Sequence, residues 1–407
     1  MTPHPRTILQ ALVPFALAYL LSYLLRAVNA VVAPELVKEF ALGPGGLGLL
    51  TAAYLLAFCA FQLPLGVLLD RFGPRRVQSV LLLVSATGCL GFALAPSFAA
   101  LFVARALIGL GFSAGLMASY KASSLWVPLE RRYLANAMIM SMGAVGLVVS
   151  TEPTALLTAA IGWRHVFLVL AGLILFAAAT IFLVVPEAKT GSPSAGFGQQ
   201  WKDLLGIMRL PLFWRVAPLL GLTAGIPIAY QTLWAGPWFR DVLGLAPLEA
   251  ARQLFWMAVA FMIGILLVGF VADRLQRRGI GPMQTLMGLL LLHTAAQVAI
   301  VLQVKVLAFP AWLLLSAVGQ SATLSFPWFA RQVGEAYSGR ANATINFSMF
   351  VAAFLIQYGV GLVIGRFPVT ATGYSPDAYL WAMGLCLGLQ CMAFVWYAWP
   401  RGNGKAT

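Results

Sequence analysis

The stretch that decides the fold is Gly66-Val67-Leu68-Leu69-Asp70-Arg71-Phe72-Gly73-Pro74-Arg75-Arg76. It joins two long apolar segments and places charged residues and a Gly-Pro turn between them. A shorter copy begins 203 residues later, since 269 − 66 = 203, and reads Gly269-Phe270-Val271-Ala272-Asp273-Arg274-Leu275-Gln276-Arg277-Arg278-Gly279. Two hydrophobic halves that carry the same loop at the same place predict an internal structural repeat.

The composition around these loops is that of a membrane protein. The chain has 407 residues, of which 61% are hydrophobic and only 9% are charged, and its mean hydropathy is +0.89. A soluble domain carries about a quarter charged residues. Apolar segments of about 20 residues span a bilayer, and we count about twelve of them. The sequence therefore predicts an all-α membrane protein with twelve transmembrane helices in two pseudo-symmetric six-helix bundles.

Two further correspondences support the repeat. Ala135-Asn136-Ala137 recurs as Ala341-Asn342-Ala343, because 341 − 135 = 206, and Glu152 falls opposite Gln357, because 357 − 152 = 205. A polar segment rich in Gly, Pro and Ser separates the halves and is typical of a flexible linker. We predict an N-terminal bundle over residues 1–186, a cytoplasmic linker over 187–210 and a C-terminal bundle over 211–407. A short interfacial helix is expected within the linker.

Two of the expected spans bear on the later argument. The fifth is expected from about Leu134 to Ile161, and the seventh from about Trp214 to Trp238. Prolines inside the second half permit bending of its helices.

The charge balance is strongly basic, with 26 Lys and Arg against 12 Asp and Glu and a net charge of +14. In a soluble protein this excess would suggest nucleic acid, but here most cations fall on one side of the predicted membrane. That distribution follows the positive-inside rule, so we expect both termini in the cytoplasm and the chain in the inner membrane, with no nucleic-acid partner. Few cations fall on the opposite side: Lys38, Arg164, Arg240, Arg252, Lys305 and Arg366.

Nothing in the sequence indicates an enzyme. The four cysteines lie in apolar segments without metal-ligand spacing and are interpreted as small buried hydrophobes. No phosphate-binding loop, pair of catalytic carboxylates or metal-ligand cluster is found. We expect the protein to bind neither a cofactor nor a metal. We expect it to be a monomer surrounded by membrane lipid.

Four charges fall inside predicted spans, where a charge costs a few kcal/mol and points to function. Arg26 shares a helix face with Tyr23, and an arginine can bind a carboxylate through two parallel hydrogen bonds. The alternative is that Arg26 snorkels to the membrane surface. Glu152 is either a proton site or a static partner of Arg26 or Arg105.

The remaining intramembrane cations lie on the fourth helix. Arg105 is a candidate for proton coupling or for a structural anchor. Lys121 is interpreted as an anion-binding residue, the alternative being contact with lipid phosphate. Polar and aromatic residues on neighbouring helices are expected to hold the uncharged part of a substrate: Tyr54, Tyr120, Tyr230, Gln231, Trp234 and Gln320.

These features together resemble the major facilitator superfamily of transporters. The carriers of the resemblance are the two loops at Asp70-Arg71 and Asp273-Arg274 and the pattern Arg105-Ala-Leu-Ile-Gly109-Leu-Gly111. The resemblance implies two bundles around a central cavity lined by helices 1, 4, 7 and 10, working by alternating access. It also implies that Asp70, Arg71 and Arg75 latch the bundles at the cytoplasmic side, and that Arg105 anchors to the backbone of helix 1.

A narrower resemblance concerns the substrate. Tyr23-Leu-Leu-Arg26, followed by Pro34, is similar to the first helix of organophosphate:phosphate antiporters, in which the arginine binds phosphate. Those antiporters supply a second arginine from helix 7, whereas the segment from Thr223 to Trp238 has none. This chain departs from the antiporter pattern at that point.

Three intramembrane cations against one acid favour an anionic substrate. We therefore expect a secondary active transporter of a small organic anion, either a carboxylate or a zwitterion, driven by protons. Two alternatives stay open. A proton-coupled exporter of drugs or metabolites would need Glu152 but not Arg26, and a membrane sensor on the same fold would bind its ligand without moving it.

Overall fold

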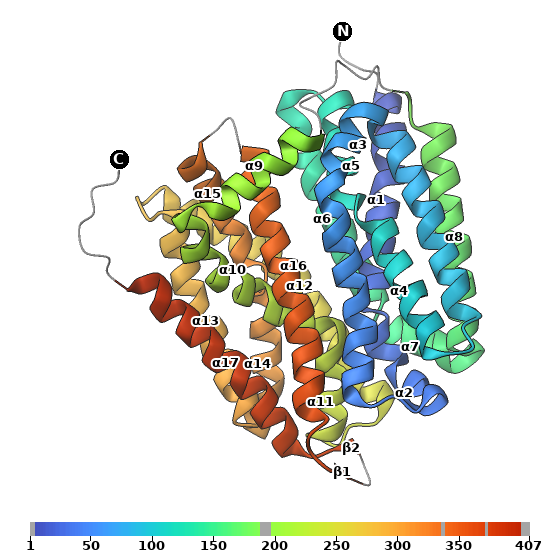
Figure 1. Ribbon diagram of the computed structural model, residues 1–407, viewed down its shortest axis with the longest axis vertical. Helices are drawn as coiled ribbons and strands as arrows, with labels where there is room; N and C mark the ends of the chain where they lie inside the picture. Colours follow the sequence, from blue (N-terminus) through green and yellow to red (C-terminus); the bar gives the residue numbers. More distant parts are fainter. Residues whose placement is uncertain (1–4, 188–196, 335–337, 371–372, 400–407) are drawn as a thin grey trace.

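The computed structural model describes residues 5–187, 197–334, 338–370 and 373–399. Helices dominate these residues and form two groups that stand side by side (Figure 1). The N-terminal group contains α1 (Pro5–Ala27), α2 (Asn29–Phe40), α3 (Pro44–Ala93), α4 (Phe98–Phe112), α5 (Gly115–Trp126), α6 (Leu129–Val149), α7 (Glu152–Ile161) and α8 (Trp163–Val184).

The C-terminal group follows the helix α9 (Phe197–Arg209), which lies within the predicted linker. Its elements are α10 (Pro211–Ala229), a π-helical turn η1 (Tyr230–Trp234), α11 (Ala235–Asp241), α12 (Pro247–Gln276), α13 (Pro282–Val301), α14 (Lys305–Val318), a 3₁₀ turn η2 (Ser321–Leu324), α15 (Ser325–Val333), α16 (Ser338–Ile364), the hairpin strands β1 (Val369–Thr370) and β2 (Gly373–Tyr374), and α17 (Pro376–Ala398). The helix α9 and the hairpin β1–β2 mark opposite ends of the molecule (Figure 1). We call these the linker end and the hairpin end.

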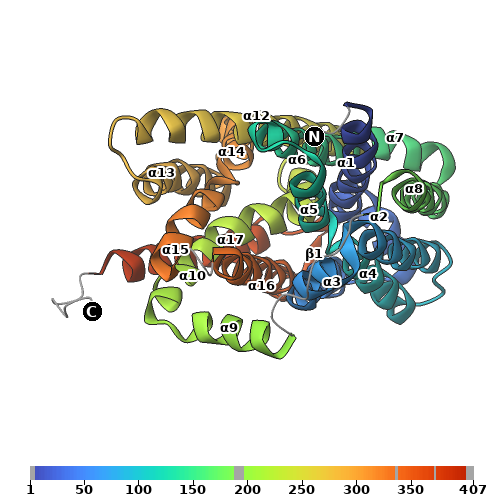
Figure 2. The same ribbon diagram turned by 90° about the horizontal axis from the view of Figure 1, so that it is seen from above.

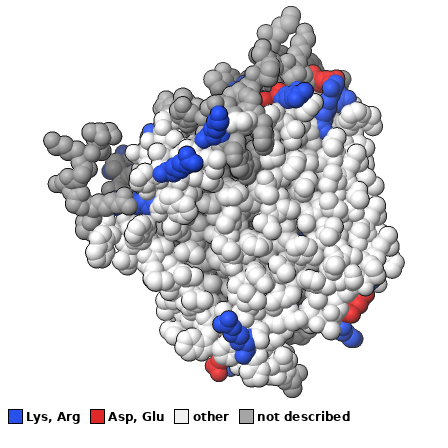
Figure 3. All heavy atoms as spheres, viewed as in Figure 1, with Lys and Arg blue, Asp and Glu red and all other residues white. Residues whose placement is uncertain are grey.

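The predicted membrane architecture is confirmed. Eleven helices in the described residues are long and apolar enough to cross a membrane, and there are twelve when the bent pair α6–α7 is counted as one span. Charged side chains gather toward the two ends of the face drawn in Figure 3, with a broad uncharged area between them. That distribution is expected of a protein that exposes its middle to hydrocarbon.

The stretch Gly66–Arg76 forms the turn between the second and third spans. Gly73 interrupts α3 with φ 76° and ψ 161°, a conformation that suits glycine because it has no Cβ. Pro74 follows with its fixed φ and resumes the helix at an early position. The Gly-Pro pair therefore produces the reversal that the sequence predicted.

The four spans that are expected to surround the centre each contain irregular backbone within the span. The first breaks at Val28, the fourth at Ser113–Ala114, the seventh at the π-helical turn η1, and the tenth at Gly319–Gln320 before η2. The breaks repeat with the offsets of the sequence motifs, since 231 − 28 = 203 and 319 − 113 = 206. Non-helical backbone at membrane depth is tolerated where protein or a water-filled cavity surrounds it.

The fifth span covers the predicted range from Leu134 to Ile161 but is bent within it. The helix ends at Val149 and restarts at Glu152 with a bend of 47°. The hydroxyls of Ser150, Thr151 and Thr154 donate to the carbonyls of the last three residues of α6, at 2.6, 2.5 and 2.6 Å. Pro153 has no N–H to continue the helix. The chain bends because local side chains satisfy the carbonyls that the break releases.

The two bundles meet along two seams. In one, α3 packs against α16 (Figure 2), and in the other α6 and α7 pack against α12. Glycine makes the first seam tight, because a Cβ on Gly48 would lie 2.8 Å from the carbonyl oxygen of Gln357, and one on Gly361 would lie 2.5 Å from that of Pro44. A buried cluster toward the hairpin end unites Ala30 and Leu47 with residues of the C-terminal bundle. The bundles are therefore packed together at the hairpin end.

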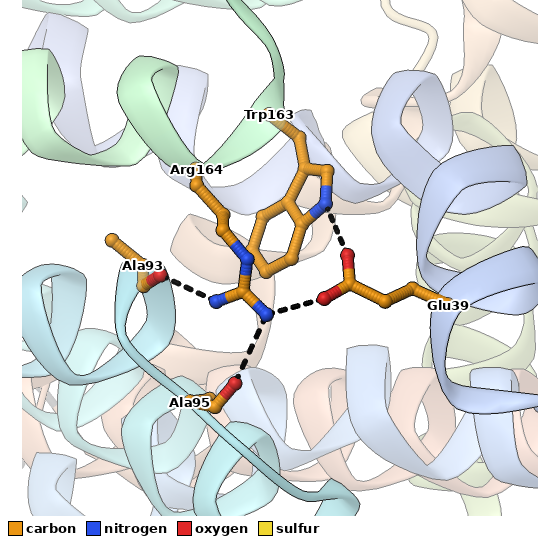
Figure 4. Close-up of polar contacts among 5 residues, drawn as sticks. All are labelled: Glu39, Ala93, Ala95, Trp163 and Arg164. Atoms are coloured by element: carbon orange, nitrogen blue, oxygen red, sulfur yellow. Dashed lines mark hydrogen bonds and ion pairs between the residues drawn. The ribbon is translucent and has the colours of Figure 1, made fainter.

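An acid ties the hairpin end of the N-terminal bundle together (Figure 4). Glu39, near the end of α2, forms an ion pair with Arg164 and accepts a hydrogen bond of 2.9 Å from Trp163 Nε1. Arg164 also donates to the carbonyls of Ala93 and Ala95, at 2.6 and 3.2 Å. The hydrogen bond from Arg164 lowers the pKa of Glu39 below its ordinary value, with Trp163 adding to the effect.

The C-terminal bundle has an acid at the corresponding place, since 241 − 39 = 202. Asp241 Oδ2 accepts a hydrogen bond of 2.5 Å from the hydroxyl of Tyr379 on α17 and one of 3.3 Å from the backbone N–H of Tyr374. In each bundle, an acid at the end of the first span thus holds the start of the last span.

Candidate functional site

Arg26 lies near the end of α1, two residues before the break at Val28, and its side chain is turned inward. Only 9% of the residue is exposed, so it does not extend to the membrane surface. Its guanidinium carbon lies 4.5 Å from the ring centre of Tyr23, 5.1 Å from Phe58 and 5.3 Å from Phe350. Phe350 belongs to α16, so rings from both bundles surround this cation and stabilise it by cation–π attraction.

The charge of Arg26 is not neutralised by any acid within ion-pair distance in the described part of the chain. Its Nε is also buried without a hydrogen-bond partner there. A buried cation that lacks a counter-ion carries a desolvation cost that a bound anion can offset. Aromatic rings stabilise a guanidinium through their faces, which leaves its N–H edge available for a forked contact with a carboxylate.

Arg105 is fully buried on α4 and binds the backbone of helix 1. Its Nη1 donates to the carbonyl of Leu25 at 2.7 Å and its Nη2 to the carbonyl of Arg26 at 3.1 Å. Carbonyls in the last turn of a helix lack intrahelical partners, and α1 ends at Ala27. Arg105 thus caps the end of α1 at the residue that is the candidate for substrate binding, Arg26. This is the geometry of a structural anchor.

The two glycines of the same motif let α4 approach the second and third spans, which together form α3. A Cβ on Gly109 would lie 2.2 Å from the carbonyl oxygen of Tyr54, and one on Gly111 would lie 2.5 Å from that of Leu81. The pattern Arg105-x-x-x-Gly109-x-Gly111 therefore brings α4 against the first, second and third spans in turn. Its spacing is explained by packing rather than by contact with a substrate.

Tyr54 is fully buried and packs between the two arginines. Its ring lies 5.0 Å from the guanidinium of Arg105 and stacks on Phe58 at 6.1 Å, while its hydroxyl donates to the carbonyl of Ser22 at 3.2 Å. Phe58 in turn faces Arg26. Tyr54 is therefore part of the support of the site.

Tyr23 is partly exposed and lies directly beside Arg26. Its ring is 6.3 Å from that of Phe261 on α12, so it also reaches the other bundle. Tyr120 on α5 is likewise partly exposed. These two residues keep the accessibility that substrate contact requires.

The candidates on helix 7 separate into two kinds. Tyr230 and Trp234 are buried in their own bundle, where Tyr230 packs 5.8 Å from Trp312 and Trp234 Nε1 donates to the carbonyl of Gln357 at 2.9 Å. Gln231 and Gln320 are partly exposed, and Gln231 Nε2 has no hydrogen-bond partner within the described residues. The π-helical turn inserts extra backbone here, so regular helical spacing does not predict which side chains share a face.

Lys121 lies with the loop residues and not with Arg26. Its Nζ donates to Asp70 Oδ1 at 2.8 Å, and the two side chains are 38% and 32% exposed. The guanidinium of Arg75 stacks 5.1 Å from the ring of Phe182 on α8. These contacts join the first loop to its own bundle.

The second copy of the loop makes local contacts as well. Asp273 pairs with Arg277 one helical turn later, at 2.8 Å. Arg71 and Arg274 are exposed at the linker end. The gating role of these residues stays a prediction.

Glu152 pairs with neither Arg26 nor Arg105. Its Oε1 accepts a hydrogen bond from Arg252 Nε on α12 at 3.0 Å, so this ion pair joins the two bundles.

A cleft of about 200 Å³ adjoins α7 and α12 at the hairpin end and is lined by Glu35 and Arg240 among other residues. Burial raises the pKa of Glu35 and its own backbone N–H partly offsets the rise, as does Arg240.

Sequence reasoning missed three residues of this arrangement. Phe58 lies four residues after Tyr54, a helical spacing that could have revealed it. Phe350 lies on the eleventh helix, which was not expected to face the centre, and Arg252 was assigned to the surface. No group of three potential metal ligands exists in the described residues.

Comparison with known proteins places this geometry in a family. A family model described as Major Facilitator Superfamily matches residues 15–357. The chain belongs to the major facilitator superfamily. This confirms the resemblance of the two loops and the Arg105 motif, and it makes the chain a multi-pass membrane protein of a transporter family.

Individual relatives match shorter parts of the chain. The "Probable sulfoacetate transporter SauU" of Cupriavidus necator is 30% identical over 154 residues, which cover 38% of this chain and 36% of that protein. The "Probable galactarate/D-glucarate transporter GudP" of Escherichia coli is 31% identical over 154 residues, covering 36% and 34%. The chain thus spans little more than a third of the length of these curated relatives.

The fold is shared over nearly the whole chain. A bacterial homolog of the human lysosomal transporter Spinster has a solved structure with a TM-score of 0.76 and 18% identity, and the match covers 97% of both chains. This likeness shows the fold of two six-helix bundles.

Proposed function

We propose that the protein is a secondary active transporter of small organic anions, with Arg26 as the group that binds the anion. The observation that carries this proposal is the buried guanidinium between the bundles, which lies within 5.3 Å of three aromatic ring centres and forms no ion pair with an acid among the described residues. A cation in that position suits a carboxylate or sulfonate, which accepts two parallel hydrogen bonds.

The relatives support the same class of substrate. Sulfoacetate, galactarate and D-glucarate, named in the descriptions of two of them, are organic anions. The partly exposed Tyr23, Tyr120, Gln231 and Gln320 supply the hydroxyl and amide groups that would orient the remainder of such a molecule.

The proposal also includes the orientation of the protein in the membrane and the ion that is coupled to transport. We place the linker end in the cytoplasm of an inner-membrane protein, because the basic loops cluster there. Alternating access would expose Arg26 to the two sides in turn, and Glu152, which forms an ion pair with Arg252, would accept the coupled proton.

Ligand binding to the purified protein tests the assignment of Arg26. At least one of the anions sulfoacetate, D-glucarate and galactarate should raise the unfolding temperature of the wild type, with glucose as the uncharged control. Arg26→Gln should weaken binding of the active anion about 10- to 100-fold, since a hydrogen bond to a charged group contributes about 1.5–3 kcal/mol. Arg366→Gln removes an exposed arginine just after the end of α16 and should leave binding unchanged.

Uptake into proteoliposomes separates the candidate functions. Anion uptake that is lost in Arg26→Gln supports the proposal, whereas binding and uptake that survive this change contradict it. Transport of uncharged or cationic compounds that needs Glu152 and not Arg26 would identify an exporter. Tight binding of an anion without any flux would identify a sensor.

A further inference from the structure

A second hollow lies within the C-terminal bundle and is lined by other residues than the cleft between the bundles. It has a volume of about 300 Å³ and lies where α11 and the loop after it meet α12 and the start of α14. We call it the α12–α14 pocket. Most of its wall is aromatic or aliphatic: Phe239, Leu243, Leu245, Trp256 and Phe309. Two polar side chains complete it, Gln253 and Lys305.

The pocket opens toward the lipid side of α12. Gln253 and Trp256 lie on the side of this helix that carries, further along at helical spacing, the exposed side chains of Ile263, Leu267 and Phe270. Trp256 itself is exposed. Apolar side chains that are exposed on a membrane span contact the acyl chains of lipids. A molecule in the pocket is therefore expected to come from the bilayer.

The turn between α13 and α14 places a cation at the rim of the pocket. Consecutive spans run in opposite directions, so α12 and α14 both begin at the hairpin end. Lys305 is the first residue of α14 and is surrounded in sequence by the exposed apolar residues Leu302, Val304, Val306 and Leu307. A lysine keeps its stem in apolar surroundings and its ammonium in the polar layer. The turn therefore indicates the level of the lipid headgroups.

The two polar side chains of the pocket have no partners within the described residues. Lys305 forms no ion pair there, and Gln253 Oε1 is buried there without a hydrogen bond. No described side chain caps the start of α14, so the first N–H groups of this helix are open as well. An ammonium beside the positive end of a helix suits a phosphate, and an amide oxygen suits a hydroxyl that donates to it.

A lysine that extends to the membrane surface without a specific partner would explain Lys305 alone. It would not explain Gln253, because a buried amide oxygen without a hydrogen bond is costly. Nor would it explain the hollow itself, because protein interiors contain few voids larger than a water molecule. A volume of about 300 Å³ lies at the lower end of the range of ligand sites, roughly 300–1,000 Å³.

We propose that the α12–α14 pocket binds one anionic phospholipid with a hydroxylated headgroup, of the type of phosphatidylglycerol, from the leaflet at the hairpin end. The phosphate lies against Lys305 and the start of α14, and a headgroup hydroxyl donates to Gln253 Oε1. An acyl chain packs on the aromatic wall of the pocket. One lipid then joins α11, α12 and α14 from outside, and this site does not depend on the anion site at Arg26.

Lipid titration of the purified full chain in detergent tests the site. Phosphatidylglycerol should raise the unfolding temperature more than phosphatidylcholine, whose headgroup has no net charge. Lys305→Gln should weaken the binding of phosphatidylglycerol about fivefold, the effect of one basic residue at an anionic lipid surface. Gln253→Leu keeps the size of the side chain and removes the amide, and it should weaken binding by about the same factor.

The matched control is Lys38→Gln, which removes an exposed lysine at the same end of the other bundle. It should leave the affinity for phosphatidylglycerol unchanged. An equal loss in Lys38→Gln, or no loss in Lys305→Gln, would mean that the lipid is attracted by diffuse charge and would overturn the site.

Inorganic phosphate distinguishes a lipid headgroup from a soluble anion. It is tested on Arg26→Gln, so that the proposed anion site does not contribute. At the same concentration as the lipid, phosphate should not displace phosphatidylglycerol, because it has no acyl chain to pack on the aromatic wall. Displacement would assign the pocket to soluble phosphate and contradict the lipid.

A measurement on the wild type covers the case in which a variant does not fold. Phosphatidylglycerol with a photoactivatable group in its acyl chain should label the segments that line the pocket, 239–245 and 305–309, in the full chain reconstituted in nanodiscs. Even labelling of all spans would contradict the site. Failure of anion binding at Arg26 would change none of these lipid measurements, so the two proposals can fail separately.

Discussion

Arg105 donates a hydrogen bond of 2.7 Å to the backbone carbonyl of Leu25, the residue directly before Arg26. Together with its second bond, to the carbonyl of Arg26 itself, this contact fixes the end of α1 where the chain breaks. An arginine suits the task because its planar fork carries several donors at fixed angles. The position of the proposed anion ligand thus depends on a residue of another helix.

Arg105→Lys tests that dependence. A lysine ammonium is a point charge on a flexible stem and cannot reproduce the fork, so one carbonyl should lose its partner. We expect destabilisation by about 1–3 kcal/mol, the cost of a buried unsatisfied polar group, together with weaker anion binding. Thermal unfolding of the purified protein measures the first effect. Arg274→Lys, at an exposed position, serves as the control, and a wild-type unfolding temperature in Arg105→Lys would refute the anchor.

Gly109→Ala tests the packing role of the same motif. The new Cβ would lie 2.2 Å from the carbonyl oxygen of Tyr54, so α4 must move away from the second span. Overpacking of this kind costs about 1–3 kcal/mol. Gly172→Ala adds the same methyl group to a helix at a site with open space around it and should be neutral or slightly stabilising. Equal unfolding temperatures for the two variants would contradict the assignment.

The ion pair of Glu39 predicts a dependence of stability on pH. Because the folded state lowers the pKa of this acid from its ordinary 4.5, the contribution is fully present above pH 4.5 and is lost as the pH falls through the folded-state pKa. Glu39→Gln should therefore be less stable than the wild type at neutral pH, and the difference should shrink below pH 4.5. Unfolding temperatures measured across this range test the point, and a difference independent of pH would exclude it.

Thr154→Val tests how the bend of the fifth span is stabilised. The hydroxyl of Thr154 donates to the carbonyl of Val149, which the break deprives of its helical partner. We expect a loss of about 1 kcal/mol, typical of one such hydrogen bond. Thr180→Val is matched to it, because that hydroxyl donates to the carbonyl of Phe176 inside a continuous helix and faces outward. The control should be nearly neutral, and similar losses in both variants would mean that the bend does not need Thr154.

The twelve spans and the repeat could be predicted because each follows from a pattern within a short stretch of the sequence. Hydrophobic length identifies each span, and the duplicated loop at Gly66 and Gly269 identifies the halves. Arg26 could be singled out for the same reason, since a cation within an apolar run is costly wherever its neighbours lie.

The partners of the charged residues could not be predicted, because they depend on where helices break. Counting along a straight fourth helix placed Lys121 deep in the membrane, yet that span is interrupted at Ser113–Ala114 and Lys121 meets Asp70. Tyr230 and Trp234 were likewise expected to hold the substrate, but a π-helical turn spans both and each is buried in its own bundle. For Glu152, sequence offered Arg26 or Arg105 as partners, and the bend of its helix brings it to Arg252 instead.

The acids Glu39 and Asp241 carry a consequence for biogenesis. Each acid binds the start of the last span of its own half, so the contact between the first and last spans needs no residue of the other half. Since the ribosome delivers the N-terminal half first, its ring of six spans can close before the later six have been synthesised. Duplication of an ancestral half-length chain would then have doubled a six-helix bundle whose first and last spans were already in contact.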